Sequence, residues 1–96
     1  MAKLDVSRID NLLSSKYRLA VLAFLSGGDE IDFNYFKSEL DISDGNLSSH
    51  ISKLETAGYV AVKKDFEGKK PKTTYRITKK GLEQYEQYLN EIAKLF

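Results

Sequence analysis

The chain has 96 residues, no cysteine, one histidine, and 15 Lys and Arg residues against 14 Asp and Glu residues. This length predicts one domain, residues 1–96, because two domains of half the size would each bury too little apolar surface. Without cysteine the chain has no disulfide framework, thiolate nucleophile or thiolate metal site, and one histidine cannot form a multi-histidine cluster within a subunit. We therefore predict no metal and no cofactor.

The apolar segments are too short to cross a membrane. The longest apolar run, residues 19–25, has seven residues, whereas a spanning helix needs about 20. The first residues lack the apolar stretch of a signal peptide, so we expect a cytoplasmic protein without a membrane partner. No nucleophile–base pair has motif support, and we expect a protein that is not an enzyme.

The N-terminal third predicts helices and one short strand. Apolar residues recur at helical spacing over residues 5–13, which predicts a short first helix. Ser14 or Ser15 can cap a second helix that ends at the glycine pair 27–28. The pattern leaves open whether the serines break one long helix or separate two. Residues 30–32 alternate in polarity and predict a short strand.

Residues 33–57 predict a helix-turn-helix. A two-turn helix over 33–40 precedes a tight polar turn and a second helix that Ser43 or Asp44 can cap. Since the apolar positions of the second helix face inward, its outer face is free to enter the major groove of DNA. Gly45 would allow a phosphate to approach the backbone closely. The candidate contacts on this helix are Ser43, Asn46, Ser48, Ser49, Ser52 and Lys53. A merely solvated polar face is the alternative.

Residues 59–77 predict a β-hairpin, the wing. Its strands are residues 59–66, with Val60, Val62 and Phe66 on one face, and residues 72–77, with alternate residues facing the core. Residues 67–71 contain Gly and Pro and predict the turn between them.

Positive charge is concentrated around this hairpin. Residues 63–80 contain eight basic and two acidic side chains, although the whole chain has a net charge of only +1. Like charges opposite each other destabilise a hairpin, so such a stripe favours a polyanionic partner. Lysines that protect a sheet edge from aggregation are the alternative. The candidate contacts of the wing are Lys63, Lys69, Lys70, Lys72 and Arg76.

The last predicted helix, residues 78–96 with Thr78 as its cap, carries an apolar seam at spacings of three and four. The seam can pack on its own domain, but a helix of about 18 residues, or about 27 Å, overhangs so small a body. We therefore predict a symmetric homodimer. The predicted interface residues are Leu82, Tyr85, Leu89, Ile92 and Phe96. His50 lies next to the inward-facing positions of the second helix of the helix-turn-helix. We expect it to be a partly buried residue that packs against other side chains or caps a backbone group.

Four segments, residues 12–22, 36–40, 42–60 and 63–81, resemble the compact MarR/ArsR-like winged-helix regulators of archaea and bacteria, over roughly residues 9–90. The resemblance implies an α+β, mostly α fold, a winged helix-turn-helix with a two- or three-stranded antiparallel wing and a terminal dimerisation helix. It implies a helix in the major groove, a wing on the DNA backbone or minor groove, and dimerisation through terminal helices. The chain lacks the thiols with which ArsR-like sensors bind metals. Larger MarR-like proteins bind aromatic acids between extra dimerisation helices, and most of these helices are missing here. The resemblance therefore implies no effector for this chain.

These observations predict a sequence-preferring, double-stranded DNA-binding transcriptional regulator that acts as a dimeric repressor. The alternative is a winged-helix protein–protein interaction module in a larger assembly, with the basic wing on an acidic partner.

Overall fold

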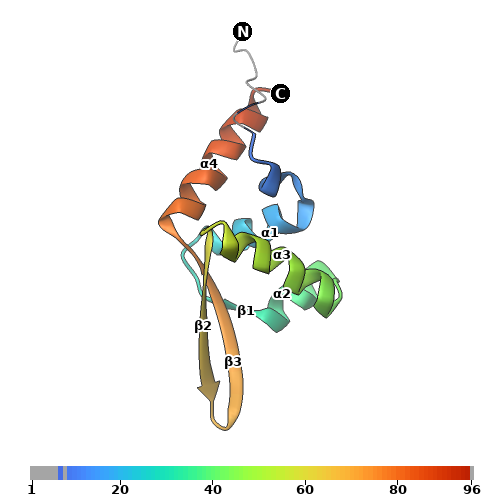
Figure 1. Ribbon diagram of the computed structural model, residues 1–96, viewed down its shortest axis with the longest axis vertical. Helices are drawn as coiled ribbons and strands as arrows, with labels where there is room; N and C mark the ends of the chain where they lie inside the picture. The colour runs from blue at the N-terminus through green and yellow to red at the C-terminus, as the bar shows by residue number, and fades with distance from the viewer. Residues whose placement is uncertain (1–6, 8, 96) are drawn as a thin grey trace.

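The computed structural model describes residues 7 and 9–95, and it confirms a mostly helical fold with a small antiparallel sheet (Figure 1). A compact helical body carries the wing at one end and the last helix at the other. In chain order the elements are the 3-10 helix η2 (Asn11–Ser14), α1 (Lys16–Leu25), β1 (Ile31–Asp32), α2 (Phe33–Leu40), α3 (Asp44–Thr56), β2 (Val60–Glu67), β3 (Lys70–Ile77) and α4 (Lys79–Ala93).

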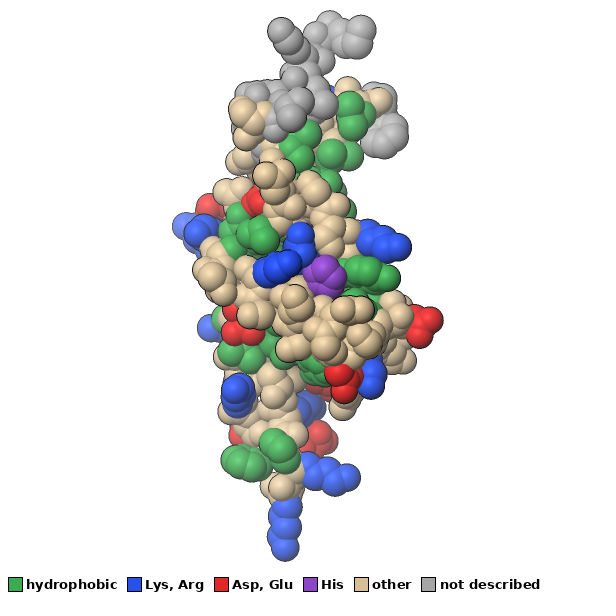
Figure 2. Space-filling model, turned by 45° about the vertical axis from the view of Figure 1, so that its right-hand side comes forward, with side chains coloured by type: hydrophobic (Ala, Val, Ile, Leu, Met, Phe, Trp, Pro, Cys, Tyr) green, Lys and Arg blue, Asp and Glu red, His purple; other side chains and the backbone are tan. Residues whose placement is uncertain are grey.

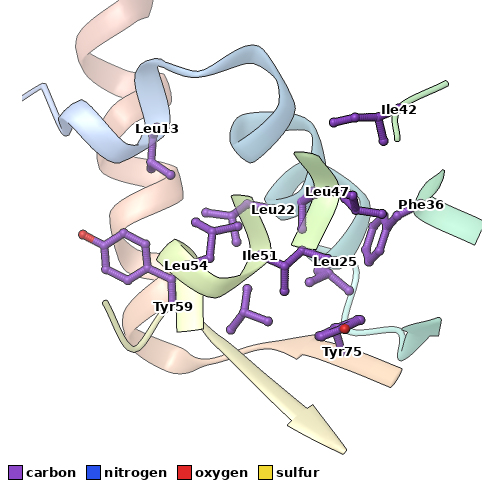
Figure 3. Packing of buried hydrophobic residues seen from close by; sticks show 12 residues of the cluster. Leu13, Leu22, Leu25, Phe36, Ile42, Leu47, Ile51, Leu54, Tyr59 and Tyr75 are labelled. Atoms are coloured by element: carbon purple, nitrogen blue, oxygen red, sulfur yellow. The ribbon is translucent and has the colours of Figure 1, made fainter. Parts of the chain in front are cut away.

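The hydrophobic core lies between α1, α2, α3 and the base of the sheet (Figure 3). Phe36 from α2 and Leu47 from α3 are completely buried, and Tyr75 from β3 closes the core on the side of the sheet. The inward positions predicted for the second helix of the helix-turn-helix are confirmed, since Leu47, Ile51 and Leu54 are all buried. The opposite face of α3 is therefore fixed toward solvent.

The N-terminal segment differs from the predicted helix over residues 5–13. Residues 1–6 and 8 lie outside the described residues, and the residues described in this segment form 3-10 turns, among them η2, in place of an α-helix. Asp10 caps η2 through a hydrogen bond from the Leu12 N–H to its carboxylate, 2.8 Å. Ser15 has extended backbone (φ −77°, ψ 126°) and caps α1, so the serines separate two helices.

The sheet has the strand order β1-β3-β2, with both pairs antiparallel. The predicted turn over residues 67–71 is too long, because Glu67 already pairs with Lys70 and only Gly68 and Lys69 lie between the strands. Gly68 has φ +66°, a conformation that suits glycine in a tight hairpin turn. Pro71 therefore belongs to β3, at a position where β3 has only β2 beside it.

Helix α4 is locked to the start of the wing. Thr78 caps it as predicted, accepting a hydrogen bond from the Gly81 N–H (3.0 Å) and donating one to the Gly58 carbonyl (2.6 Å). A side-chain Cβ at Gly81 would overlap the Tyr59 carbonyl oxygen, so only glycine fits this contact. The helix ends at Ala93, and among the described residues no helix has the length and apolar character to span a membrane.

Candidate nucleic-acid interface

The first turn of α3 is built by its own side chains. Ser43, in extended conformation, accepts a hydrogen bond from the Asn46 N–H (3.2 Å) and satisfies one of the free amides at the helix start. Asp44 follows in the first turn, where a negative charge suits the helix dipole, and forms an ion pair with Lys37 of α2 at 2.7 Å. The two helices of the helix-turn-helix are thus tied together at the surface.

The predicted contact residues of α3 share one solvent-exposed surface. Ser49 and Ser52 lie opposite the buried positions at about 100° per residue, with the other predicted side chains toward either edge. Short hydroxyl and amide groups can approach base edges and phosphates closely and can both donate and accept hydrogen bonds. The exposed residues in this set are Ser43, Asn46, Ser48, Ser49, Ser52 and Lys53.

Gly45 lies on the same surface and is not required by the fold. A Cβ there would meet no other atom within 4 Å, and its backbone is not in the left-handed region. Glycine inside a helix destabilises it relative to alanine, so its presence at the exposed start of α3 calls for another reason. Close approach of a ligand to the backbone of α3 is such a reason.

The register of the two wing strands keeps like charges from facing each other. Lys63 faces Thr74, Asp65 faces Lys72 and Glu67 faces Lys70 across the two strands. The expectation that like charges lie opposite each other is therefore wrong: where two charged residues face each other, they have opposite signs. The reason is the short turn, which sets a register that the sequence pattern did not specify.

The predicted basic residues are spread along the wing, from Arg76 opposite Ala61 near its base to Lys69 and Lys70 at its free end. Lys69 lies in the turn, and Lys72 is half-buried and forms an exposed ion pair with Glu67 at 3.4 Å. Such a pair is worth little in water, so the lysine remains available to an anion. Blue side chains along the lower part of Figure 2 mark this end of the molecule. The predicted residues at exposed positions are Lys63, Lys69, Lys70 and Arg76.

A cluster that sequence reasoning missed lies beside α3. The Arg18 Nη1 atom is 2.9 Å from His50 Nδ1, and its Nε donates to the Leu12 carbonyl at 2.6 Å. Because a guanidinium only donates, Nδ1 accepts and the ring proton lies on Nε2. Tyr17 packs on the imidazole, with ring centroids 5.5 Å apart. The expectation that His50 (purple in Figure 2) packs is confirmed, and the cluster holds the cation Arg18 against the second helix of the helix-turn-helix.

The environment of His50 disfavours the charged form of the imidazole. Burial, then the charges of Arg18 and Lys53, lower the pKa of this histidine below its usual 6.5. No group of His, Asp or Glu side chains within the described part of the chain is arranged to hold a metal ion. The described side chains near α3 and on the wing are mainly hydroxyl, amide and ammonium groups, which can form hydrogen bonds and attract an anion.

A polar helix face beside a basic hairpin defines a winged-helix DNA-binding domain. Residues 17–96 match the family described as winged helix DNA-binding domain, and the chain belongs to this family. It is 39% identical over 84 residues to the uncharacterized protein MJ0432 of Methanocaldococcus jannaschii, covering 88% of this chain and 91% of that protein.

Solved structures share the fold. A transcriptional regulator homologue from Pyrococcus horikoshii OT3 superposes with a TM-score of 0.82 at 30% identity, covering 90% of this chain and 85% of that one. A PadR family transcriptional regulator from Eggerthella lenta superposes with a TM-score of 0.71 at 24% identity, over 81% and 72% of the two chains. The predicted resemblance to winged-helix regulators is thus confirmed, and the chain has the winged-helix DNA-binding fold that these regulators share.

Proposed function

We propose that the protein represses transcription by binding a preferred double-stranded DNA sequence as a homodimer. The observation that carries the proposal is the two-sided character of α3. One side is buried in the core, and the other presents to solvent a surface of small hydrogen-bonding groups in the element that precedes the basic wing. Helices of this kind fit the major groove, where each base pair presents its own pattern of donors and acceptors.

In the proposed complex, α3 supplies sequence preference and the wing supplies affinity. Contacts of Asn46, Ser49 and Ser52 with base edges would distinguish sequences, whereas Lys69 and Lys70 would neutralise phosphates of any sequence. The domain layout we propose is a helix-turn-helix over residues 33–57, a wing over 59–77 and a dimerisation helix over 78–96.

The proposed dimer is supported by exposed apolar side chains on α4 and in the turn that follows it. Leu89 is 42% exposed and Leu95 is 58% exposed, although both are large aliphatic residues. Tyr85 packs partly against the core of its own chain, so the interface is centred nearer the C-terminal end of α4 than the predicted seam. Of the other predicted interface residues, Leu82 and Ile92 are half-buried, and Phe96 lies outside the described residues.

The test is fluorescence anisotropy of a labelled random duplex of about 30 base pairs at 50 and 200 mM salt. A protein that contacts many phosphates releases their counterions, so we expect micromolar binding at low salt and a loss of about 10³-fold at higher salt. Such a result justifies selection of the preferred sequence from a random pool. Absence of binding at 50 mM salt would contradict the proposal and favour an acidic protein partner.

A further inference from the structure

The free end of the wing exposes an aromatic side chain. Phe66 is 72% exposed, the highest value among the large hydrophobic residues of the described chain, and faces Pro71 across the hairpin. Val62, on the same face of the ribbon, is 38% exposed. The sequence pattern correctly puts Val62 and Phe66 on one face of the ribbon, and the structure shows that this face is exposed toward the tip.

The geometry of the sheet explains this exposure. β1 pairs only with Thr74 and Tyr75, so the hairpin beyond them is a two-stranded ribbon with no third strand. The ribbon extends away from the helical body (Figure 1), and the molecule measures 57 Å along its longest axis against 25 and 21 Å across. Phe66 therefore lies on the two-stranded part of the ribbon, opposite Pro71, and most of its ring is in water.

The charges around the ring indicate what can cover it. Lys64 lies on the same face as Phe66, and Lys69 lies in the adjoining turn. The carboxylates of the ribbon, Asp65 and Glu67, lie on the other face, because successive side chains of a strand alternate. The ring thus shares its face of a narrow projection with Lys64 and adjoins Lys69 in the turn, and this combination is complementary to an apolar slot lined by negative charge.

We propose that Phe66, backed by Pro71, is a wedge that enters the DNA minor groove, partly unstacks a base step and bends the duplex. The floor of the minor groove is narrow, and phosphates flank it on both sides. Apolar side chains inserted there kink DNA, and the bend brings more of the duplex against the protein. This inference deepens the proposed function and rests on it. It gives the wing a preference for flexible steps such as TA, where unstacking costs least.

The backbone around the ring suits this role. Pro71 has a fixed φ and no N–H, so the strand opposite Phe66 is stiff and presents an apolar ring of its own. The Phe66 N–H donates to the Asp65 carboxylate at 2.8 Å, so the backbone donor next to the exposed ring already has a hydrogen-bond acceptor within the chain. Neither feature depends on a partner, and the wedge is already formed in the free protein.

The first experiment uses Phe66→Trp, which introduces one tryptophan into a chain that has none. On addition of the 30 base-pair duplex, we expect quenched emission and reduced access to acrylamide, because the indole stacks on a base step. The matched control is Phe24→Trp, a position 37% exposed on α1, whose emission should not change. Emission of the Phe66→Trp variant that is unchanged by saturating DNA overturns the wedge. A blue shift on concentrating the DNA-free variant also overturns it, since a second copy of the chain would then cover the ring.

The second experiment uses Phe66→Ala and a duplex with a donor and an acceptor dye at its ends. The wild-type protein should raise energy transfer by bending the duplex, and the variant should lose most of that rise. Its affinity should fall about fivefold or more, with the salt dependence unchanged, because an apolar contact releases no counterions. If wild type binds DNA with steep salt dependence and the variant bends it equally, the wedge is refuted and the proposed function stands. If wild type binds no DNA, the proposed function fails.

Discussion

Gly45→Ala should stabilise the protein and weaken its binding to DNA. The new methyl group would meet no atom of the chain within 4 Å, so it adds no strain. Alanine is better than glycine in a helix by about 0.5–1 kcal/mol. For a domain of this size 1 kcal/mol corresponds to about 4–8 °C, so thermal unfolding followed by circular dichroism should shift upward by about 2–8 °C.

The DNA affinity should change in the opposite direction. If the first turn of α3 donates a backbone hydrogen bond to a phosphate, a methyl group at Gly45 holds that phosphate away. A hydrogen bond to a charged group is worth about 1.5 kcal/mol, so each protomer should lose about tenfold in affinity by anisotropy. The control is Gly27→Ala, which also meets no atom but lies in the turn after α1. Undiminished DNA affinity of Gly45→Ala, or a lower unfolding temperature, would refute this reasoning.

Three further predictions concern the wing, α4 and His50. Lys69→Ala combined with Lys70→Ala should weaken binding to all duplexes alike and reduce the slope of log K against log salt by about 2, while an unchanged slope removes the wing tip from the interface. Leu89→Asp should give a monomer by sedimentation equilibrium and lose DNA affinity, whereas its neighbour Asn90→Asp adds the same charge at an exposed polar position and should remain a dimer; a monomeric wild type contradicts the dimer. Because the pKa of His50 is lowered on folding, the unfolded chain binds more protons below pH 6.5, so urea unfolding should show wild type losing more stability than His50→Gln between pH 7 and 5. Equal losses would show that the histidine does not contribute.

Local features of the fold could be predicted because their causes are local. Ser43 and Thr78 cap their helices through side chains that contact amides three residues ahead, as a sequence can show. The two faces of α3 follow from a helical period that the positions of Leu47 and Ile51 make evident.

Other features depend on distances between elements, which a sequence does not contain. The contact of Arg18 with His50 joins residues 32 positions apart, and nothing in the intervening chain indicates it. The hydroxyl of Tyr59 donates to the Asp10 carboxylate, and burial, together with this contact, raises the pKa of the tyrosine to about 12. The exposure of Phe66 was missed for a related reason. Alternation gives the face of a strand, but the packing of the helices on the base of the sheet determines how far that face is covered.

The glycine contact at the base of α4 has a consequence for the spacing of DNA sites. Since Gly81 lies against the Tyr59 backbone and Thr78 binds Gly58, α4 leaves the end of α3 in one fixed direction. In a homodimer paired through α4, the separation and rotation of the two α3 helices are then set by the fold. B-DNA repeats about every 10.5 base pairs, so inserting five base pairs between half-sites would turn one of them to the far side of the duplex. Inserting ten would restore the side but not the distance, and such a dimer would bind both altered sites poorly.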